Sequence, residues 1–250
     1  MNLILLPADC ADTVTLTDRA LVQHLGSVLR AAVGQTLKVG KLGGRIGHAR
    51  IAALTADAVT LTDIACLTAP PPKLNLTVVL ALPRPKVLRR LVLDMTAMGV
   101  QTLYLVNSYR SEKSYWQSPL VCQIDDYVRE GMQQACDTVP MVVHLRTRLK
   151  PFVEDELPAL LAGKQGLIAH PYAAATLHEQ LPTAEPMILA IGAEGGWIDY
   201  EVALFAAQGF MPVSLGTRIL RTENAVSVLC GQFLLHSHLS AAGLMAQNHR

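Results

Sequence analysis

Two glycine-containing segments near the end of the chain carry the residue types that could do chemistry. In the first, the apolar run Met187–Ile191 leads into the loop GAEGGW at residues 192–197. In the second, a short apolar run stops at Gly216 and leads into TRILRT at residues 217–222, ahead of a helical pattern. Glycine loops at the carboxyl ends of adjacent parallel strands form the crevice in which open α/β sheets bind ligands. The two segments therefore predict a ligand site on a parallel sheet.

The spacing of these glycines excludes two common nucleotide sites. Neither GxGxxG nor GxxxxGK[S/T] occurs, so a Rossmann dinucleotide site and a P-loop would both lack their phosphate cradle. The guanidinium groups of Arg218 and Arg221 could stabilise an anion that develops on a substrate. Alternatively, the glycines only turn the chain, and one arginine pairs with Glu194 or Glu223 and holds the loops.

Both segments resemble signatures of one enzyme class. GAEGGWIDYE at residues 192–201 looks like the GPEGGF-S-x-x-E segment of the SPOUT-class RNA methyltransferases, and LGTRILRTENA at residues 215–225 is similar to their LGxRILRTETA signature. Within that class the chain most resembles the ribosomal RNA small subunit methyltransferase E family, which methylates N3 of a uridine in 16S rRNA. The resemblance implies S-adenosyl-L-methionine as methyl donor, a C-terminal trefoil knot and a homodimer.

The resemblance also implies roles for residues of this chain. Arg221, preferred for its place in the signature, and Arg218 are the catalytic candidates that would stabilise a uracil anion. No general base is assigned, and no metal is required. The expected cofactor contacts lie in three loops and are His170, Pro171, Gly192, Glu194, Gly195, Gly196, Leu215, Gly216, Ile219 and Leu220.

Composition limits the class of protein. The 250 residues are 51% hydrophobic and 16% charged, which is typical of a globular chain with a sizeable core. A net charge of +1 argues against a generally basic surface, so any RNA contact must come from local patches. The five cysteines are scattered and never in C-x-x-C spacing, which favours reduced thiols in a cytoplasmic protein without a zinc site. The uncharged stretch 225–246 is expected to be a buried or subunit-interface helix and not a membrane span.

The first domain is expected to span residues 1–69. Short strand-like runs separated by glycines indicate a small β-barrel, interrupted by a helix over residues 18–32 with Thr17 as its N-cap. Within that helix, His24-Leu25 and Val28-Leu29-Arg30 resemble the H-L-x-x-V-L-R segment of the family's PUA-like RNA-binding domain. Arg30 is thus a candidate phosphate contact, unless it only solvates the helix end, and His24 is expected to be packed and not catalytic.

The second domain is expected to span residues 73–250, after a stiff linker of three consecutive prolines. Alternating strand and helix patterns there predict an α/β domain with a mainly parallel sheet. Tyr115 and Trp116 lie in a loop whose composition suits the stacking of an unpaired base. Basic residues near strand ends are candidate RNA contacts, because neutralised phosphates release counterions; they are Arg84, Lys86, Arg89, Arg110 and Lys113. A solvated surface or an ordinary packed loop would show the same composition.

One expected function and two alternatives follow from these features. The chain is expected to methylate uracil N3 in 16S ribosomal RNA as a homodimer, acting on the free RNA or on the small ribosomal subunit. Another SPOUT activity, on a tRNA ribose 2′-oxygen or on guanine N1, would use the same loops. A non-catalytic RNA-binding assembly factor with the same fold need not bind S-adenosylmethionine.

Overall fold

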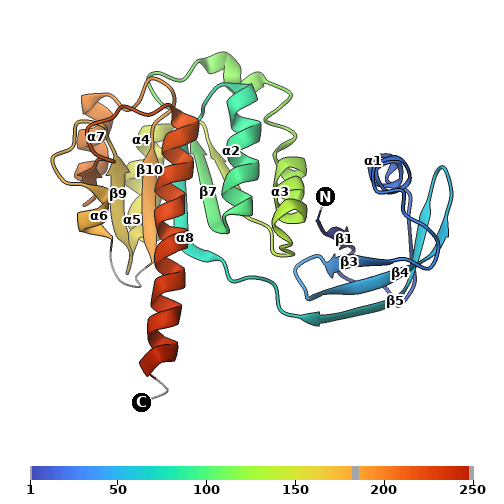
Figure 1. Cartoon of the computed structure of the whole chain (residues 1–250). Helices are drawn as coiled ribbons and strands as arrows, with labels where there is room; N and C mark the ends of the chain where they lie inside the picture. Colours follow the sequence, from blue (N-terminus) through green and yellow to red (C-terminus); the bar gives the residue numbers. More distant parts are fainter. Residues whose placement is uncertain (1, 182–185, 248–250) are drawn as a thin grey trace. The chain divides into compact units, whose positions relative to one another are not determined.

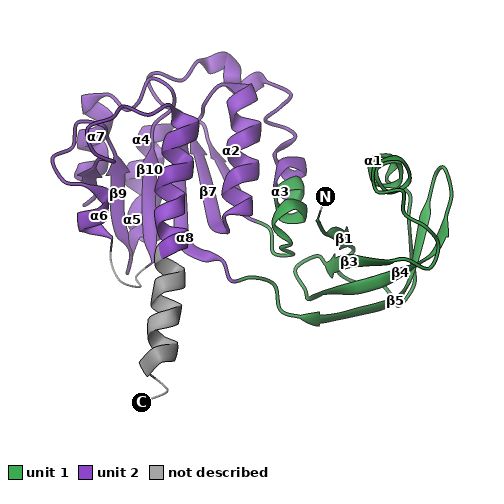
Figure 2. Cartoon of the chain, in the orientation of Figure 1, with its two compact units in different colours: residues 1–71, 129–140 green, residues 72–128, 141–250 purple. Residues whose placement is uncertain are grey.

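The chain folds into two compact units (Figure 2). The computed structural model describes the backbone of residues 2–181 and 186–247, and the side chains of these residues up to position 235. The first unit comprises Met1–Pro71 together with Arg129–Pro140, and the second comprises Pro72–Val128 with Met141–Arg250. The division therefore falls in the proline linker. The segment 129–140, which the sequence interpretation placed in the second domain, belongs to the first unit.

A five-stranded sheet forms most of the first unit, with the strand order β1-β3-β4-β5-β2. The β1 strand runs parallel to β3, and the other pairings are antiparallel. The strands are β1 (Ile4–Leu6), β2 (Val14–Leu16), β3 (Thr36–Lys41), β4 (Ile46–Leu54) and β5 (Val59–Thr68) (Figure 1). In this order β1 and β2 are the edges of the sheet, so its closure into a PUA-like barrel stays a prediction.

The helix predicted over residues 18–32 is shorter in the structure. The α1 helix (Arg19–Gln23) begins after Asp18 and not after Thr17, because the Asp18 carboxylate accepts a backbone amide hydrogen bond at 2.8 Å. A π-helical turn, η1 (His24–Val28), follows. Arg30 has a φ of +49°, a left-handed conformation that a right-handed helix cannot include. The prediction that the helix continues to position 32 is therefore wrong.

The segment 129–140 joins the first unit through hydrogen bonds. It contains the end of α3 (Ile124–Ala135) and the residues that follow it. The Asn2 backbone amide donates to the Gln133 carbonyl at 3.2 Å, and the Asn2 side chain donates to the Gln134 carbonyl at 2.8 Å. The segment is thus bonded to Asn2, more than a hundred positions away, an arrangement that no local pattern of the sequence indicates.

The second unit is built on a six-stranded sheet, and the predicted parallel sheet is confirmed. Its order is β11-β9-β10-β6-β7-β8, and all of these pairings are parallel. The strands are β6 (Leu74–Ala81), β7 (Val100–Val106), β8 (Val142–Arg146), β9 (Gln165–Ala169), β10 (Met187–Ile191) and β11 (Met211–Val213). Because parallel strands end at the same edge of a sheet, the loops after β9, β10 and β11 become neighbours there.

Helices and helical turns follow each of these strands (Figure 1). In chain order they are α2 (Pro85–Ala97), η2 (Lys113–Gln117), α3, α4 (Leu149–Pro151), η3 (Phe152–Glu156), α5 (Leu157–Leu161), α6 (Leu177–Gln180), α7 (Asp199–Ala206) and α8 (Thr222–Gln247). The last helix packs against α2 and β6. Its Cys230 is completely buried, and this burial raises the pKa of the thiol to about 12. Among the described residues, no helix is long and apolar enough to cross a membrane.

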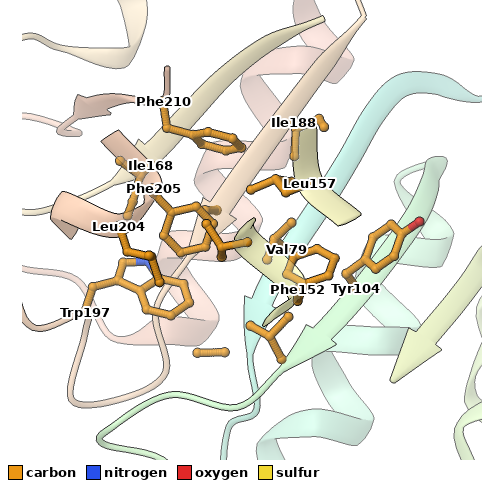
Figure 3. Packing of buried hydrophobic residues seen from close by; sticks show 14 of the residues in the cluster. Val79, Tyr104, Phe152, Leu157, Ile168, Ile188, Trp197, Leu204, Phe205 and Phe210 are labelled. Carbon is orange, nitrogen blue, oxygen red and sulfur yellow. The ribbon is translucent and has the colours of Figure 1, made fainter. Parts of the chain in front are cut away.

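An aromatic cluster in the core of the second unit packs against the end of the loop after β10 (Figure 3). The rings of Trp197 and Phe205 have centroids 5.3 Å apart, and Phe205 and Phe210 are separated by 5.2 Å. A Cβ atom on Gly166 would come within 2.7 Å of the Phe210 ring, so the glycine in β9 leaves the space that this ring fills. Because Trp197 closes the loop after β10, the core fixes the end of that loop.

Candidate active site

Three loops at the carboxyl edge of the parallel sheet enclose a pocket that is open to solvent, and the empty space in the pocket and its mouth together is about 670 Å³. They follow β9, β10 and β11, the three strands whose loops the sequence interpretation combined into one site. A pocket in this position suits a small ligand or cofactor. Its walls are Ala169, His170, Pro171, Ile191, Gly192, Gly196, Val213, Ser214, Leu215, Arg218, Ile219, Leu220, Thr222, Ala225 and Leu229.

The glycine loop after β10 folds tightly on itself. A Cβ atom on Gly192 would lie 2.8 Å from the Cα of Gly196 and 3.0 Å from the amide nitrogen of Trp197. Gly196 has a φ of +68°, and its amide donates to the Ala193 carbonyl at 2.8 Å. Only glycine at position 192 permits this close approach of backbone to backbone. The loop therefore exposes main-chain groups of residues 192 and 196 to the pocket.

The loop after β9 wraps around the end of β11. The His170 amide donates to the Val213 carbonyl at 2.9 Å on one side. On the other side, the Ser214 amide donates to the Ala175 carbonyl and the Leu177 amide donates to the Ser214 carbonyl, both at 2.9 Å. Residues 213 and 214 are thus held between two parts of the segment 170–177. This arrangement fixes two walls of the pocket against each other.

Seven of the ten predicted cofactor residues line the pocket. They are His170, Pro171, Gly192, Gly196, Leu215, Ile219 and Leu220. The other three, Glu194, Gly195 and Gly216, are not among its walls. Gly216 has a φ of +97° and forms the turn after β11. Gly216 therefore turns the chain, while its neighbour Leu215 lines the pocket.

Glu194 and Gly195 face other loops of the same unit. The Glu194 carboxylate accepts a hydrogen bond from the Arg84 amide at 3.0 Å, and the Gly195 carbonyl accepts one from the Arg110 guanidinium. The glycine loop thus has two sides, because Gly192 and Gly196 line the pocket whereas Glu194 and Gly195 hold the loops after β6 and β7. The contact of Glu194 and Gly195 with the cofactor stays a prediction.

The two catalytic candidates are placed differently. Arg218 lines the pocket and is exposed to solvent, whereas Arg221 is exposed but is not one of the walls. The Arg221 carbonyl accepts the first hydrogen bond of α8, from the Ala225 amide at 2.8 Å. Within the described part of the chain, neither arginine forms an ion pair with Glu194 or Glu223. The alternative in which one of these pairs only holds the loops is therefore not supported.

Seven residues that line the pocket were not predicted from the sequence. They are Ala169, Ile191, Val213, Ser214, Thr222, Ala225 and Leu229. Four of them end or follow the three strands, and the other three lie on the first turns of α8. Positions at strand ends and at the start of the next helix could have been included, because these are where ligands of parallel sheets bind. Periodicity alone does not show which side of a helix faces the pocket.

The candidate RNA contacts are exposed residues of both units. Arg84, Lys86, Arg89, Arg110 and Lys113 are all exposed in the second unit, and Arg30 is exposed in the first. The guanidinium of Arg89 lies 5.8 Å from the centre of the Tyr127 ring, so this residue packs on an aromatic side chain. His24 is expected to be packed, and its Nε2 atom is buried without a hydrogen-bond partner among the described residues.

The aromatic residues of the loop after β7 are mostly engaged within the protein. Trp116 is half-buried and its Nε1 donates to Asn107 Oδ1 at 3.1 Å. The Tyr115 hydroxyl donates to the Glu112 carboxylate at 3.1 Å. Partial burial and this hydrogen bond raise the pKa of Tyr115.

The described residues contain no group of three or more histidine, cysteine, aspartate or glutamate side chains arranged to hold a metal ion.

Glu201 connects the glycine loop to the loop after β7. It is 2% exposed, and its two carboxylate oxygens accept hydrogen bonds from different backbone amides: Oε1 from Tyr109 at 2.8 Å and Oε2 from Ile198 at 3.0 Å. Glu201 matches the last residue of the GPEGGF-S-x-x-E signature, but the sequence alone does not indicate its contact with the loop after β7. A buried carboxylate with two amide donors is a strong contact, because each bond involves a charged acceptor.

We expect Glu201→Ala to lower the free energy of unfolding of the second unit by about 3 kcal/mol or more, since two bonds to a charged group are lost. Glu201→Gln keeps one acceptor oxygen and should lose less. Both tryptophans of the chain, Trp116 and Trp197, lie in the second unit, so tryptophan fluorescence during urea unfolding follows that unit. Unchanged unfolding of the alanine variant would contradict the assigned contact.

Comparison with known proteins identifies the class and then the family. Residues 70–234, which include the parallel sheet and the pocket, match the family of RNA methyltransferase domains. The class of this protein is therefore that of the RNA methyltransferases. Ribosomal RNA small subunit methyltransferase E of Treponema pallidum is 30% identical over 224 residues, which make up 86% of this chain and 82% of that protein. The chain belongs to the ribosomal RNA small subunit methyltransferase E family, and it is accordingly a methyltransferase of RNA.

Two further comparisons agree with this assignment. The same methyltransferase of Synechocystis is 28% identical over 227 residues, 88% of this chain and 72% of that protein. The crystal structure of ribosomal RNA small subunit methyltransferase E from Neisseria gonorrhoeae, bound to S-adenosyl methionine, superposes with a TM-score of 0.79. That structure is 21% identical and the match covers 93% of this chain and 96% of that one, so it supports the mixed α/β fold.

Proposed function

We propose that this protein transfers a methyl group from S-adenosylmethionine to N3 of a uracil in 16S ribosomal RNA. The observation that carries the proposal is the pocket at the carboxyl edge of the parallel sheet, built from both signature loops of the family. A related protein with the same fold is bound to S-adenosyl methionine. The relatives that share the family name act on ribosomal RNA of the small subunit.

The pocket walls fit S-adenosylmethionine. They are largely apolar and include the close backbone approach at Gly192, where a side chain would fill the cradle. The residues that would hold the cofactor are His170, Pro171, Gly192, Gly196, Leu215, Ile219 and Leu220, together with the buried polar side chains of Ser214 and Thr222. When bound, the cofactor supplies a methyl group on a positively charged sulfur.

Arg218 is the residue of this chain that we assign to charge stabilisation. Uracil N3 becomes a good nucleophile only after its proton leaves, and the resulting anion spreads over O2 and O4. A guanidinium at the pocket wall stabilises that charge as it develops. Arg218 occupies such a position and Arg221 does not, so we revise the order of preference taken from the signature. The general base stays unassigned.

The RNA would approach along the loops that border the glycine loop. The Arg110 guanidinium bonds to the Gly195 carbonyl and the Arg84 backbone amide bonds to the Glu194 carboxylate, so one guanidinium group and the backbone of a second arginine lie beside the glycine loop. Arg30, Lys86, Arg89 and Lys113 would add phosphate contacts.

We also propose that the protein acts in the cytoplasm as a homodimer. The trefoil knot belongs to the same proposal, and the wrapping of the segment 170–177 around Ser214 supports it.

A nucleoside digest tests the proposed position. Small ribosomal subunits from a strain that lacks this gene are treated with the purified protein and S-adenosylmethionine carrying a labelled methyl group, and the nucleosides are separated by mass spectrometry. We expect label in N3-methyluridine. Label in a 2′-O-methylated nucleoside or in N1-methylguanosine would assign a different methylation. A protein that binds no S-adenosylmethionine in calorimetry would be an RNA-binding assembly factor.

A further inference from the structure

A tight turn after β7 carries Tyr109 and Arg110 at its tip. The Ser111 amide donates to the Ser108 carbonyl at 3.1 Å, which closes a four-residue turn. The two serine hydroxyls lie 2.9 Å apart, and the Ser111 hydroxyl donates to the Leu82 carbonyl at 2.8 Å. Both serines are buried. The base of the turn is therefore fixed to the end of β6.

The tip of the turn is fixed by two other elements. The Tyr109 amide donates to the buried carboxylate of Glu201 on α7, and the Arg110 guanidinium bonds to the carbonyl of Gly195 in the glycine loop. Tyr109 is 80% exposed, the largest value among the exposed large hydrophobic residues described. An aromatic ring with a rigid backbone and a bare face is unusual, because tyrosines normally cover part of their ring.

The other aromatic residues of this loop are not available in the same way. Tyr115 and Trp116 are half-buried and form hydrogen bonds with Glu112 and Asn107. The sequence suggested these two residues as the stacking pair, and the structure instead leaves Tyr109 as the exposed ring of the loop. Arg110 follows Tyr109 in the chain and its guanidinium bonds to the Gly195 carbonyl, while the Arg84 amide bonds to the Glu194 carboxylate of the same glycine loop.

We propose that Tyr109 is the platform on which an unpaired base of the RNA substrate stacks, and that Glu201 is the positioning residue that holds it. Stacking on an aromatic face is how proteins recognise unpaired RNA bases, and a fixed backbone reduces the entropy lost on binding. Adjacent guanidinium groups would hold the flanking phosphates. This inference rests on the proposed function, because it names the chemical group of RNA that the site holds next to the methyl-donor pocket.

Binding of a 16S rRNA transcript, measured without S-adenosylmethionine, tests the platform. We expect Tyr109→Ala to weaken the affinity about 5- to 100-fold, the range found for the loss of one stacked base. Tyr109→Phe keeps the ring face and should bind within about twofold of the unchanged protein. Val142→Ala is a control at another exposed apolar residue. Val142 is 50% exposed and is the first residue of β8, so it lies at the amino ends of the parallel strands, whereas Tyr109 follows the carboxyl end of β7. It should leave RNA binding unchanged.

Further readouts separate stacking from a structural role. Tyr109→Ala should raise the KM for RNA while the affinity for S-adenosylmethionine stays unchanged. In a Tyr109→Trp variant, addition of a single-stranded RNA oligonucleotide should quench fluorescence beyond the signal of Trp116 and Trp197. Equal RNA affinity of Tyr109→Ala and the unchanged protein would overturn the inference.

Two other outcomes are also informative. Weakened binding to assembled small subunits with unchanged binding to the bare transcript would assign Tyr109 to a protein contact and overturn the base platform. Loss of RNA binding by Tyr109→Ala, in a protein that methylates no RNA, would uphold the platform and refute the proposed function.

Discussion

Replacing Gly192 by alanine is expected to lower the affinity for S-adenosylmethionine by about a hundredfold, with methylation lost in parallel. The new Cβ would lie 2.8 and 2.9 Å from the Cα and carbonyl carbon of Gly196 and 3.0 Å from the Trp197 nitrogen. All three are backbone atoms, so no change of rotamer relieves the overlap. Overpacking of this kind costs about 1–3 kcal/mol, and each 1.4 kcal/mol corresponds to roughly tenfold in affinity. Isothermal titration calorimetry with S-adenosylmethionine measures the effect.

A matched glycine substitution is the control for this prediction. A Cβ atom on Gly26 would meet nothing within 4 Å, and its φ is not in the left-handed region. Gly26→Ala should therefore bind the cofactor as the unchanged protein does. Thermal unfolding monitored by tryptophan fluorescence checks that Gly192→Ala still folds. Normal cofactor affinity in a folded Gly192→Ala protein would show that the glycine loop is not part of the cofactor site.

The second large effect is expected at Arg218. Arg218→Ala should reduce kcat by about a hundred- to a thousandfold, the usual cost of removing one group that stabilises a developing negative charge. The affinity for S-adenosylmethionine should change much less, because the guanidinium is assigned to the uracil anion. The measurements are single-turnover methylation of small subunits lacking the modification, and calorimetry with the cofactor.

Two variants sharpen this experiment. Arg218→Lys keeps the positive charge but not the planar fork of donors, so it should recover part of the rate. Arg221→Ala changes the other arginine of the signature, which is exposed and is not a pocket wall. We expect a smaller loss of kcat from Arg221→Ala than from Arg218→Ala. The reverse order would restore Arg221 as the residue that stabilises the anion.

Much of the second unit could be predicted from the sequence because its strands are continuous apolar runs. Met187–Ile191 was expected as a strand and is β10, completely buried between β9 and β6. Strands buried on both faces need apolar side chains at every position, and such a continuous apolar run can be recognised in the sequence. The predicted helix over residues 18–32 is too long. Its apolar spacing is helical to the end, but Arg30 has a left-handed backbone conformation that the spacing does not show.

The glycine loops were found from the sequence because their residue types are a local requirement. Gly192 must lack a side chain for the loop to close on itself, and Gly196 and Gly216 have positive φ values. The direction in which each loop residue points could not be found in this way. Glu194 and Gly195, predicted as cofactor contacts with their neighbours, are bonded to Arg84 and Arg110 and do not line the pocket.

The sequence by itself determined the α/β class of the second unit, the three loops that form the pocket and the family of the chain, since these depend on short runs of neighbouring residues. Only the tertiary structure decided which arginine lines the pocket, that residues 129–140 belong to the first unit, and that Glu201 holds the turn of Tyr109. The physical reason is that these features depend on contacts between residues tens to more than a hundred positions apart, such as the 92 positions between Tyr109 and Glu201. Local propensity carries no information about such contacts, which form when the sheet brings distant loops to one edge.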